Sequence, residues 1–105
     1  MDSAAADEAS IRETLAAYVA GYERLDAAAI KRVYPGAGNV DLSNVRSYKL
    51  GLEKVDITAQ GDKATVTAMR KVKAEMKAGN TQEVTRPTEF SLRRAGNGWI
   101  IERVR

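Results

Sequence analysis

Cysteine and histidine are both absent from this chain of 105 residues. Without cysteine the protein forms no disulfides, and it has no thiolate nucleophile, iron–sulfur cluster or Cys-ligated zinc. Without histidine it lacks the usual general base near neutral pH, the Ser-His and Cys-His nucleophile systems, and the commonest ligand of transition metals. We therefore expect neither a metal site nor a cofactor.

Long apolar runs are also lacking, since none approaches the roughly 20 residues that cross a bilayer. The first ten residues, MDSAAADEAS, do not show the basic and then apolar order of a signal peptide. We expect no membrane association, and a cytoplasmic location if the chain stands alone. The length suits one domain. The Ala-rich residues 1–9 are predicted to be a flexible lead-in, which leaves 10–105 as a single domain.

Positive charge is scarce in the first part of the chain and plentiful in the second. The net charge of +3 divides into −3 over residues 1–44 and +6 over residues 45–105. A nucleic-acid surface interleaves clustered bases with aromatic residues. Here acids interrupt every basic run, and the chain has only one Phe and one Trp. The pattern favours a solvated strand face, and nucleic-acid binding is kept only as a weak alternative.

Two helices are predicted in the first third of the chain. Ser10 and Glu13 fit a capping box at the start of the first helix. The helix could also begin earlier, since Asp7 and Glu8 suit a first turn. Apolar residues then recur three and four positions apart, which places them on one face. These residues are Ile11, Leu15, Tyr18, Val19, Tyr22 and Leu25. Asp26 suits the N-cap of a second helix over residues 27–34, and a Pro-Gly pair ends that helix.

In the second half of the chain the apolar period changes to two, which predicts strands. Two sets of alternating apolar residues flank Glu53-Lys54 in opposite phase, so we expect a bulge there that keeps both sets on one face. Turn residues at 60–62, 78–80 and 95–98 separate four strands. The sequence therefore predicts an α+β domain, with its helices packed in the concavity of a curved four-strand antiparallel meander.

Three segments of the chain carry a resemblance to a known family. They are Ile11…Leu15…Tyr18…Tyr22…Leu25-Asp26…Val33-Tyr34-Pro35, then Ile57…Gly61-Asp62-Lys63-Ala64-Thr65-Val66, and finally Phe90-Ser91-Leu92-Arg93…Gly98-Trp99-Ile100-Ile101. Together they span about residues 8–105 and resemble the NTF2-like superfamily, also described as SnoaL-like or cystatin-like α+β proteins. The Tyr-Glu-Arg-Leu-Asp stretch with its following Tyr-Pro is most similar to NTF2-like domains appended to bacterial multidomain proteins such as Ser/Thr kinases.

The resemblance implies a cone-shaped domain with a pocket between the helix and the curved sheet, often dimeric through the sheet. The superfamily includes ketosteroid isomerases, dehydratases and members without a reaction, so the fold does not select a chemistry. Its enzymes use pocket carboxylates, histidines and tyrosines. No inward carboxylate stands out here, because Asp26 is explained by capping and most strand carboxylates alternate out of phase with the apolar residues. Those strand carboxylates are Asp56, Glu75, Glu83 and Glu89.

Tyrosines and arginines supply the remaining candidate ligand-binding residues. Tyr18, Tyr22 and Tyr34 lie at helical spacing, so they are either core residues whose hydroxyls reach a polar rim or residues that line a pocket. Arg70 and Arg86 stand in phase with the core residues of their strands. A buried guanidinium without a partner is costly, so such a pair needs an anion, an acid or water.

The relative position of the two arginines depends on the hairpin between their strands. A three-residue turn over 78–80 places Arg70 opposite Thr88 and diagonal to Arg86, within reach of one shared anion. Two alternatives remove Arg70 from a pocket. One is a second bulge beside it, and the other is a sheet so long that its far half faces solvent or a second copy.

These patterns favour a non-catalytic accessory domain that forms a homodimer through its sheet and binds a small anionic ligand. The expected dimer surface is the outer face of a central strand. It comprises Thr65, Thr67, Met69 and Lys71. One alternative is a small-molecule isomerase or lyase of the ketosteroid-isomerase or SnoaL type, with Tyr18 or Tyr22 as a proton donor. A second alternative is weak nucleic-acid binding through the basic sheet.

Overall fold

The structure is a computed structural model that describes residues 3–38 and 40–105. Helix α1 covers Ser3–Glu23 and helix α2 covers Ala27–Val33, and a short 3-10 turn follows at Pro35–Ala37. The strands are β1 (Val45–Gln60), β2 (Lys63–Met76), β3 (Thr81–Ala95) and β4 (Gly98–Val104). Within the described residues, no helix is both long and apolar enough to cross a membrane.

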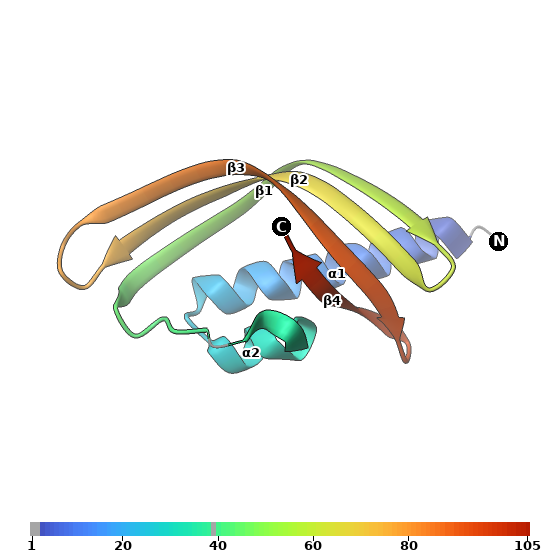
Figure 1. Cartoon of the computed structure of the whole chain (residues 1–105), viewed down its shortest axis with the longest axis horizontal. Helices are drawn as coiled ribbons and strands as arrows, with labels where there is room; N and C mark the ends of the chain where they lie inside the picture. The colour runs from blue at the N-terminus through green and yellow to red at the C-terminus, as the bar shows by residue number, and fades with distance from the viewer. Residues whose placement is uncertain (1–2, 39) are drawn as a thin grey trace.

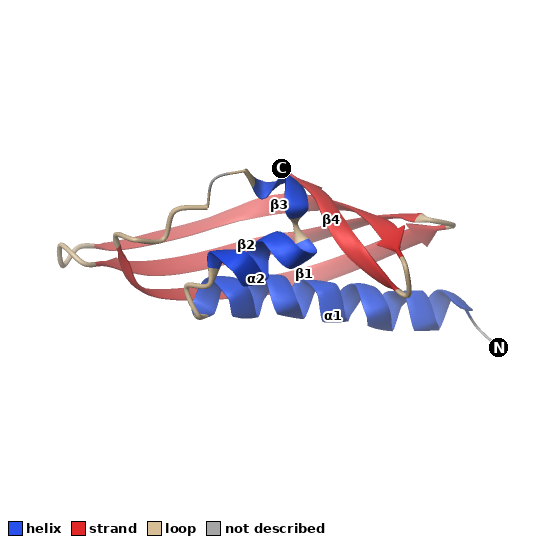
Figure 2. Cartoon of the chain, turned by 90° about the horizontal axis from the view of Figure 1, so that it is seen from below, coloured by secondary structure: helices blue, strands red, loops and turns tan. Residues whose placement is uncertain are grey.

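The four strands form one antiparallel sheet in the order β1-β2-β3-β4, which is the predicted meander. The sheet arches over the helices, so α1 and α2 lie on its concave side (Figure 1 and Figure 2). The predicted bulge is confirmed, because the β1–β2 register shifts between Glu53 and Asp56 and Lys54 has a φ of 54°. The extra residue bends the strand and leaves apolar side chains from both sides of the bulge on the core face. These are Leu50, Leu52, Val55 and Ile57.

Helix α1 begins earlier than the capping box indicated. The predicted start at Ser10 is wrong, because the helix begins at Ser3 and Ser10 lies in its third turn. Alanine is the strongest helix former, and the Ala-rich residues 3–9 extend the helix backwards. Met1 and Asp2 lie outside the described residues. The flexibility of residues 1–9 stays a prediction, and a substitution of Asp7 can test it.

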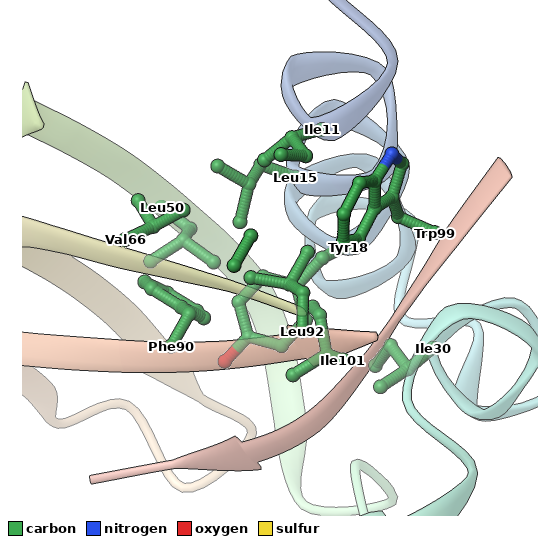
Figure 3. Packing of buried hydrophobic residues seen from close by; sticks show 11 residues of the cluster. Ile11, Leu15, Tyr18, Ile30, Leu50, Val66, Phe90, Leu92, Trp99 and Ile101 are labelled. Atoms are coloured by element: carbon green, nitrogen blue, oxygen red, sulfur yellow. The ribbon is translucent and has the colours of Figure 1, made fainter. Parts of the chain in front are cut away.

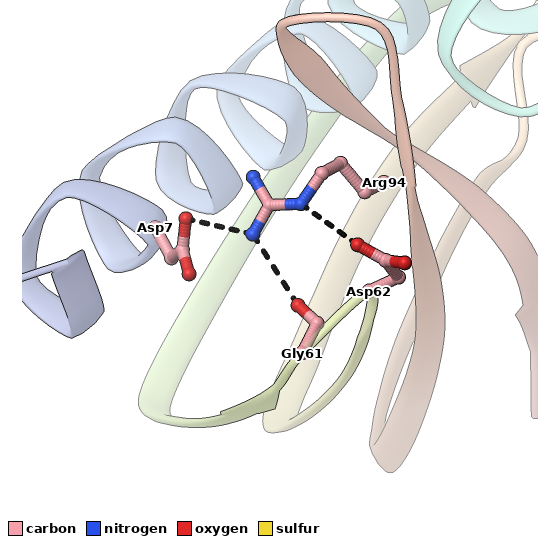
Figure 4. A network of polar contacts seen from close by, with 4 residues as sticks. All are labelled: Asp7, Gly61, Asp62 and Arg94. Carbon is pink, nitrogen blue, oxygen red and sulfur yellow. Dashed lines mark hydrogen bonds and ion pairs between the residues drawn. The ribbon is translucent and has the colours of Figure 1, made fainter.

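Arg94 of β3 holds the first turns of α1 against the sheet (Figure 4). Its Nη2 donates to the Asp7 carboxylate at 3.0 Å, and its Nε donates to the Asp62 carboxylate at 3.2 Å. The hydrogen bond to Asp7, more than any other contact, raises the pKa of Arg94. The guanidinium carbon also lies 4.6 Å from the centre of the Trp99 ring. One side chain therefore joins α1, the β1–β2 turn and β4.

The turn between the helices brings α2 close to α1. Leu25, two residues after the last residue of α1, has the left-handed backbone conformation with a φ of 55°. The N–H of Asp26 then donates to the carbonyl of Gly21 at 2.9 Å. Asp26 then caps α2, as predicted, by accepting the N–H of Ala29 at 3.1 Å. A Cβ on residue 21 would lie 2.8 Å from Cγ1 of Ile30. Glycine at this position is what allows the two helices to pack this closely.

The core fills the space between α1, α2 and the sheet (Figure 3). Its buried side chains are Ile11, Leu15, Tyr18, Ile30, Leu50, Ala64, Val66, Phe90, Leu92, Trp99 and Ile101. Trp99 is buried in this core, and its carbonyl accepts the buried hydroxyl of Thr14 at 3.0 Å. Toward the β2–β3 hairpin the sheet extends past the helices, and residues 81–87 are all exposed. The expectation of a long sheet whose far half faces solvent is thus met along β3.

Candidate ligand-binding site

Arg70 of β2 and Arg86 of β3 lie directly opposite each other in the sheet. The predicted pairing of Arg70 with Thr88 is wrong, because the partner of Arg70 lies two residues earlier on β3. The suggested second bulge beside Arg70 is also wrong, because the described β2–β3 register runs without a shift. The two arginines are therefore a direct cross-strand pair on the face that carries the core, a closer relationship than the predicted diagonal one.

The reason for the register error lies in the β2–β3 hairpin. The loop consists of residues 77–79 rather than 78–80, because the N–H of Met76 donates to the carbonyl of Asn80 at 2.9 Å. Gly79 closes the loop with a φ of 102°, which glycine adopts without the strain that a side chain brings. The predicted loop at 78–80 lies one position too late. A shift of one position in the loop changes every β2–β3 pair by two residues.

Arg70 is a half-buried cation with incomplete hydrogen bonding. Its Nη2 donates to the hydroxyl of Tyr48 at 3.2 Å, and its guanidinium carbon lies 5.6 Å from the centre of the Tyr22 ring. Its Nε is buried and has no hydrogen-bond partner. Arg70 also forms no ion pair with any described residue. A buried donor left without a partner is destabilising, and the effect is larger when the group is charged.

Three tyrosine rings form a cluster beside Arg70. Tyr22 and Tyr48 are stacked with ring centres 4.9 Å apart, and Tyr18 meets Tyr22 edge-on at 5.1 Å. Tyr18 is only 2% exposed and its ring also packs on Phe90, so it belongs to the core. Burial raises the pKa of Tyr18, although the nearby charge of Arg70 opposes the effect, and burial likewise raises the pKa of Tyr22. Both hydroxyls are therefore neutral near pH 7.

The structure brings together some of the predicted site residues and separates others. Tyr18, Tyr22 and Arg70 form one cluster, whereas Tyr34 lies at the C-cap of α2 and packs against the edge of the core. Tyr48 completes the cluster and was not among the predicted site residues. Its alternation with the apolar residues of β1 placed it on the correct face. The sequence does not reveal the β1–β2 register, and this register brings the Tyr48 hydroxyl to Arg70.

The two arginines share a small cavity of about 220 Å³. It is lined by Arg70, Arg86, Thr88, Val104 and Arg105. Arg86 is exposed at its mouth, while Thr88 is buried and donates its hydroxyl to the carbonyl of Arg86 at 3.3 Å. Three of the five lining residues are arginines and none has a carboxylate side chain. Arg70 and Arg86 share the core-bearing face, whereas Arg105 is paired across the sheet with Glu89 on the outer face. Such a cavity has a positive potential and many N–H donors, which suits a small anion.

Several carboxylates form ion pairs outside the arginine-lined cavity. Glu102 accepts Lys63 at 2.8 Å and lies near Arg93, and the hydrogen bond from Lys63 is the main cause that lowers the pKa of Glu102. On the outer face of the sheet, Lys71 pairs with Glu53 at 3.0 Å. These pairs offset the basic charge of the outer face and give the nucleic-acid alternative no support. The described residues also contain no group of three or more acids that could hold a metal.

Three larger hollows differ in character from the arginine-lined cavity. A groove of about 340 Å³ between α1 and β1 is lined mainly by aliphatic side chains such as Leu15 and Leu52. A hollow of about 430 Å³ lies on the outer face where the sheet arches, and Met69 and Pro87 form part of its floor. A hollow of about 520 Å³ is lined by lysines and acids together, among them Lys73 and Glu83. None of the three has charges of one sign in its lining without an acid or an aliphatic majority beside them. The arginine-lined cavity is therefore the candidate ligand-binding site.

Comparison with solved structures identifies the fold. The chain matches an NTF2-like superfamily protein from Salmonella enterica serovar Typhimurium with a TM-score of 0.82 and 16% identity, covering 96% of this chain and 89% of the other. It matches a candidate aromatic ring hydroxylase from Novosphingobium aromaticivorans with a TM-score of 0.81 and 20% identity, over 93% and 85% of the two chains.

A third match is a candidate dehydratase of the NTF2-like family from Streptomyces avermitilis, with a TM-score of 0.72 and 14% identity over 94% of each chain. The protein therefore has the NTF2-like fold, as the sequence resemblance implied. At these identities the similarity establishes the fold and leaves the chemistry open. Neither a protein-family model nor a curated protein matches the sequence.

Proposed function

We propose that this domain is a non-catalytic accessory domain that binds a small anion in the cavity between Arg70 and Arg86. The observation that carries the proposal is the direct opposition of Arg70 and Arg86, neither of which pairs with an acid among the described residues. An anion in the cavity would offset the repulsion between the two guanidinium groups. The hydroxyl of Tyr48 accepts a hydrogen bond from Arg70, which leaves the positive charge of Arg70 without an acidic partner.

Binding without chemistry is supported by what lines the cavity. A general base is needed for isomerisation or dehydration, and none of the five lining residues can serve as one near neutral pH. The chain has no histidine. The carboxylate of Glu23 accepts the N–H of Leu50 at 3.4 Å, and Glu23 is not among the residues that line the cavity. These facts favour recognition of an anion over its conversion.

The test is a thermal-shift screen of small carboxylates, phosphates and sulfate on the wild type and three variants. Arg70→Met and Arg86→Gln each remove one charge from the cavity. Arg103→Gln is the matched control, because Arg103 pairs with Ser91 on the outer face and lies outside the cavity lining. At one hundred times its dissociation constant, a ligand stabilises the fold by about 2.7 kcal/mol. We expect this gain in the wild type and the control, and its loss in both cavity variants.

An isomerase or lyase activity is the second candidate function. It is favoured by the position of Tyr22, whose ring lies 5.6 Å from the guanidinium carbon of Arg70 and whose hydroxyl can donate a hydrogen bond to a substrate oxygen. Two similar structures are also described as a candidate dehydratase and a candidate hydroxylase. Turnover of a hydroxy acid or ketosteroid by the wild type, lost in Tyr22→Phe with retained anion binding, would favour this function over simple binding.

We also propose a homodimer that buries the outer face of the sheet. Supporting it is the hollow of about 430 Å³ on that face, where Met69 and Pro87 lie opposite each other at the arch. A hollow with Met69 and Pro87 among its lining, on the outer face of the arched sheet, is a feature that a second copy can fill. Sedimentation is expected to give about twice the monomer mass of 11.4 kDa. Met69→Lys should return the monomer, and the helix variant Glu13→Lys should not.

A further inference from the structure

We propose that the groove between α1 and β1 binds an extended peptide of a partner protein, which adds as a strand to the free edge of β1. The peptide has apolar side chains at alternate positions and a basic residue at its C-terminal end. This inference is independent of the proposed function, because the groove shares no lining residue with the arginine-lined cavity. Three features carry it: an unpaired strand edge, an apolar groove beside that edge, and an acid at one end of the groove.

The free edge of β1 presents backbone groups that no other strand uses. Within the described residues, β1 is the first strand in the sheet order, so β2 alone pairs with it. The N–H of Leu50 is directed away from β2, since it donates to the Glu23 carboxylate at 3.4 Å. Because the backbone groups of a strand alternate in direction, those of Tyr48 and Leu52 face the same open side. A row of unpaired N–H and C=O groups is what a second extended backbone binds.

The opposite edge of the sheet is less open. Strand β4 has seven residues, whereas β1 has sixteen. The 3-10 turn also lies against β4, since a Cβ on Gly36 would lie 3.4 Å from the carbonyl oxygen of Glu102. The edge of β1 is therefore the one that offers room for an added strand.

The groove of about 340 Å³ beside this edge is mainly apolar. Helix α1 contributes Leu15, Ala16, Val19 and Ala20 to its lining, and β1 contributes Leu50 and Leu52. From Arg12 to Glu23 the helix rises by about 16 Å, which is the length of about five extended residues. A strand directs alternate side chains to one face. Two apolar side chains of an added strand can therefore enter the groove while its backbone pairs with β1.

Negative charge gathers at the end of the groove beside Leu50. Glu23 is exposed there and forms no ion pair with any described residue. It is the last residue of α1, whose last turn contains no basic residue. The C-terminal end of a helix has a partial negative charge that favours a cation. At the other end of the groove, Arg12 already pairs with Glu8. A basic residue of the peptide therefore complements the Glu23 end.

The direction of the peptide follows from the direction of β1. The lining of the groove runs along β1 from Leu50, beside Glu23, toward Val55. Antiparallel pairing, which is slightly more stable per residue than parallel pairing, makes the added strand run the opposite way. Its C-terminal end then lies beside Leu50, so the basic residue that meets Glu23 belongs at that end.

The experiment is an NMR titration of the isotope-labelled protein with the capped peptide Ser-Val-Thr-Val-Thr-Lys. Its two valines and its lysine share one face, so the valines can enter the groove while the lysine reaches Glu23. We expect the backbone amide resonances of Leu50 and Leu52 to move and to saturate. A second peptide, Ser-Val-Thr-Pro-Thr-Lys, keeps the charge and lacks one backbone N–H. It should bind at least about fivefold more weakly.

The variant Glu23→Gln tests the charge at the end of the groove. Its amide oxygen can still accept the N–H of Leu50, so the fold is retained. We expect the lysine-containing peptide to bind this variant about two- to fivefold more weakly than the wild type. Glu13→Gln is the matched control, because Glu13 is exposed on the same helix and lies outside the groove lining. Equal affinities of the two variants would overturn the assignment of a basic residue to the Glu23 end.

Two further results would overturn strand addition by a partner peptide. Equal affinities for the valine and proline peptides would mean that the groove binds apolar groups without backbone pairing. Movement of the Leu50 and Leu52 amide resonances with rising concentration of the Met69→Lys variant alone would identify the occupant as β1 of a second copy. Absence of binding by either peptide would overturn the inference outright, and anion binding at the arginine-lined cavity would be unaffected.

Discussion

Arg70 and Arg86 are direct cross-strand partners on β2 and β3, and the cavity that they share has no acid in its lining. Like charges directly opposite each other in a sheet are destabilising. Two other like-charged pairs, Lys49 with Lys73 and Lys63 with Arg93, are also directly opposed in the sheet. Lys73 pairs with Glu83, and both Lys63 and Arg93 pair with Glu102. Arg70 and Arg86 pair with no acid among the described residues, which suits an anion-binding site, since the favourable partner arrives with the ligand.

The first prediction is that Arg86→Gln stabilises the protein in the absence of ligand. The substitution removes one member of a repelling pair, which contributes on the order of 0.2–1 kcal/mol. Denaturant unfolding in a buffer without polyvalent anions measures the change. Arg103→Gln, on the outer face, should leave the free energy of unfolding nearly unchanged. A loss of stability in Arg86→Gln would mean that Arg86 has an acidic partner, such as one from a second copy.

The second prediction tests the face of α1 that covers the sheet. Leu15 is 4% exposed in the centre of the core, so Leu15→Ala should lower the free energy of unfolding by about 2–4 kcal/mol. Arg12 forms an exposed pair with Glu8 at 3.0 Å, and Arg12→Ala should cost only about 0.3–0.5 kcal/mol. Equal effects of the two substitutions in denaturant melts would contradict the assigned inward face.

The third prediction concerns alkaline pH. Burial raises the pKa of Tyr18 above its ordinary value of about 10, so above that pH the unfolded chain ionises while the folded protein stays protonated. The free energy of unfolding should therefore fall as pH rises from about 10, by up to about 1.4 kcal/mol per pH unit for this group. Tyr18→Phe should show a shallower decline between about pH 9 and pH 11. Parallel declines in both proteins would refute the role of Tyr18.

The fourth prediction addresses the start of the chain. Asp7 accepts Arg94 at 3.0 Å, so Asp7→Ala should lower the melting temperature even though residues 1–9 were expected to be a flexible lead-in. Glu13→Ala is the control, because Glu13 is exposed and outside this network. If the two variants melt at the same temperature as the wild type, the contact with Arg94 does not hold the first turns of α1.

Much of the fold could be predicted from the sequence because local rules agree with the global structure. The switch from helical to strand periodicity, the Asp26 cap and the bulge at Glu53-Lys54 all follow from short-range patterns, and the structure contains each. The start of α1 could not be predicted from such a short-range pattern. A capping box at Ser10 is a local signal, but helix propensity in the preceding Ala-rich residues outweighed it.

The candidate site was less predictable because it depends on contacts between distant segments. Alternation placed Arg70 and Arg86 on the same face, which is a short-range property. Their exact pairing depended on the position of the β2–β3 loop, and the partnership of Arg70 with Tyr48 depended on a second register. Sequence alone also gives no indication that the Nε of Arg70 remains without a partner.

The most direct test of the proposed site is the NMR signal of the Arg70 Nε–H group during titration with phosphate. Arg70→Lys identifies the signal by its disappearance. We predict that this resonance moves progressively and saturates as the anion fills the cavity, because an anion held at the Arg70 guanidinium changes the electronic environment of its Nε–H group. A resonance that stays fixed while phosphate binds would place the anion elsewhere and contradict the account.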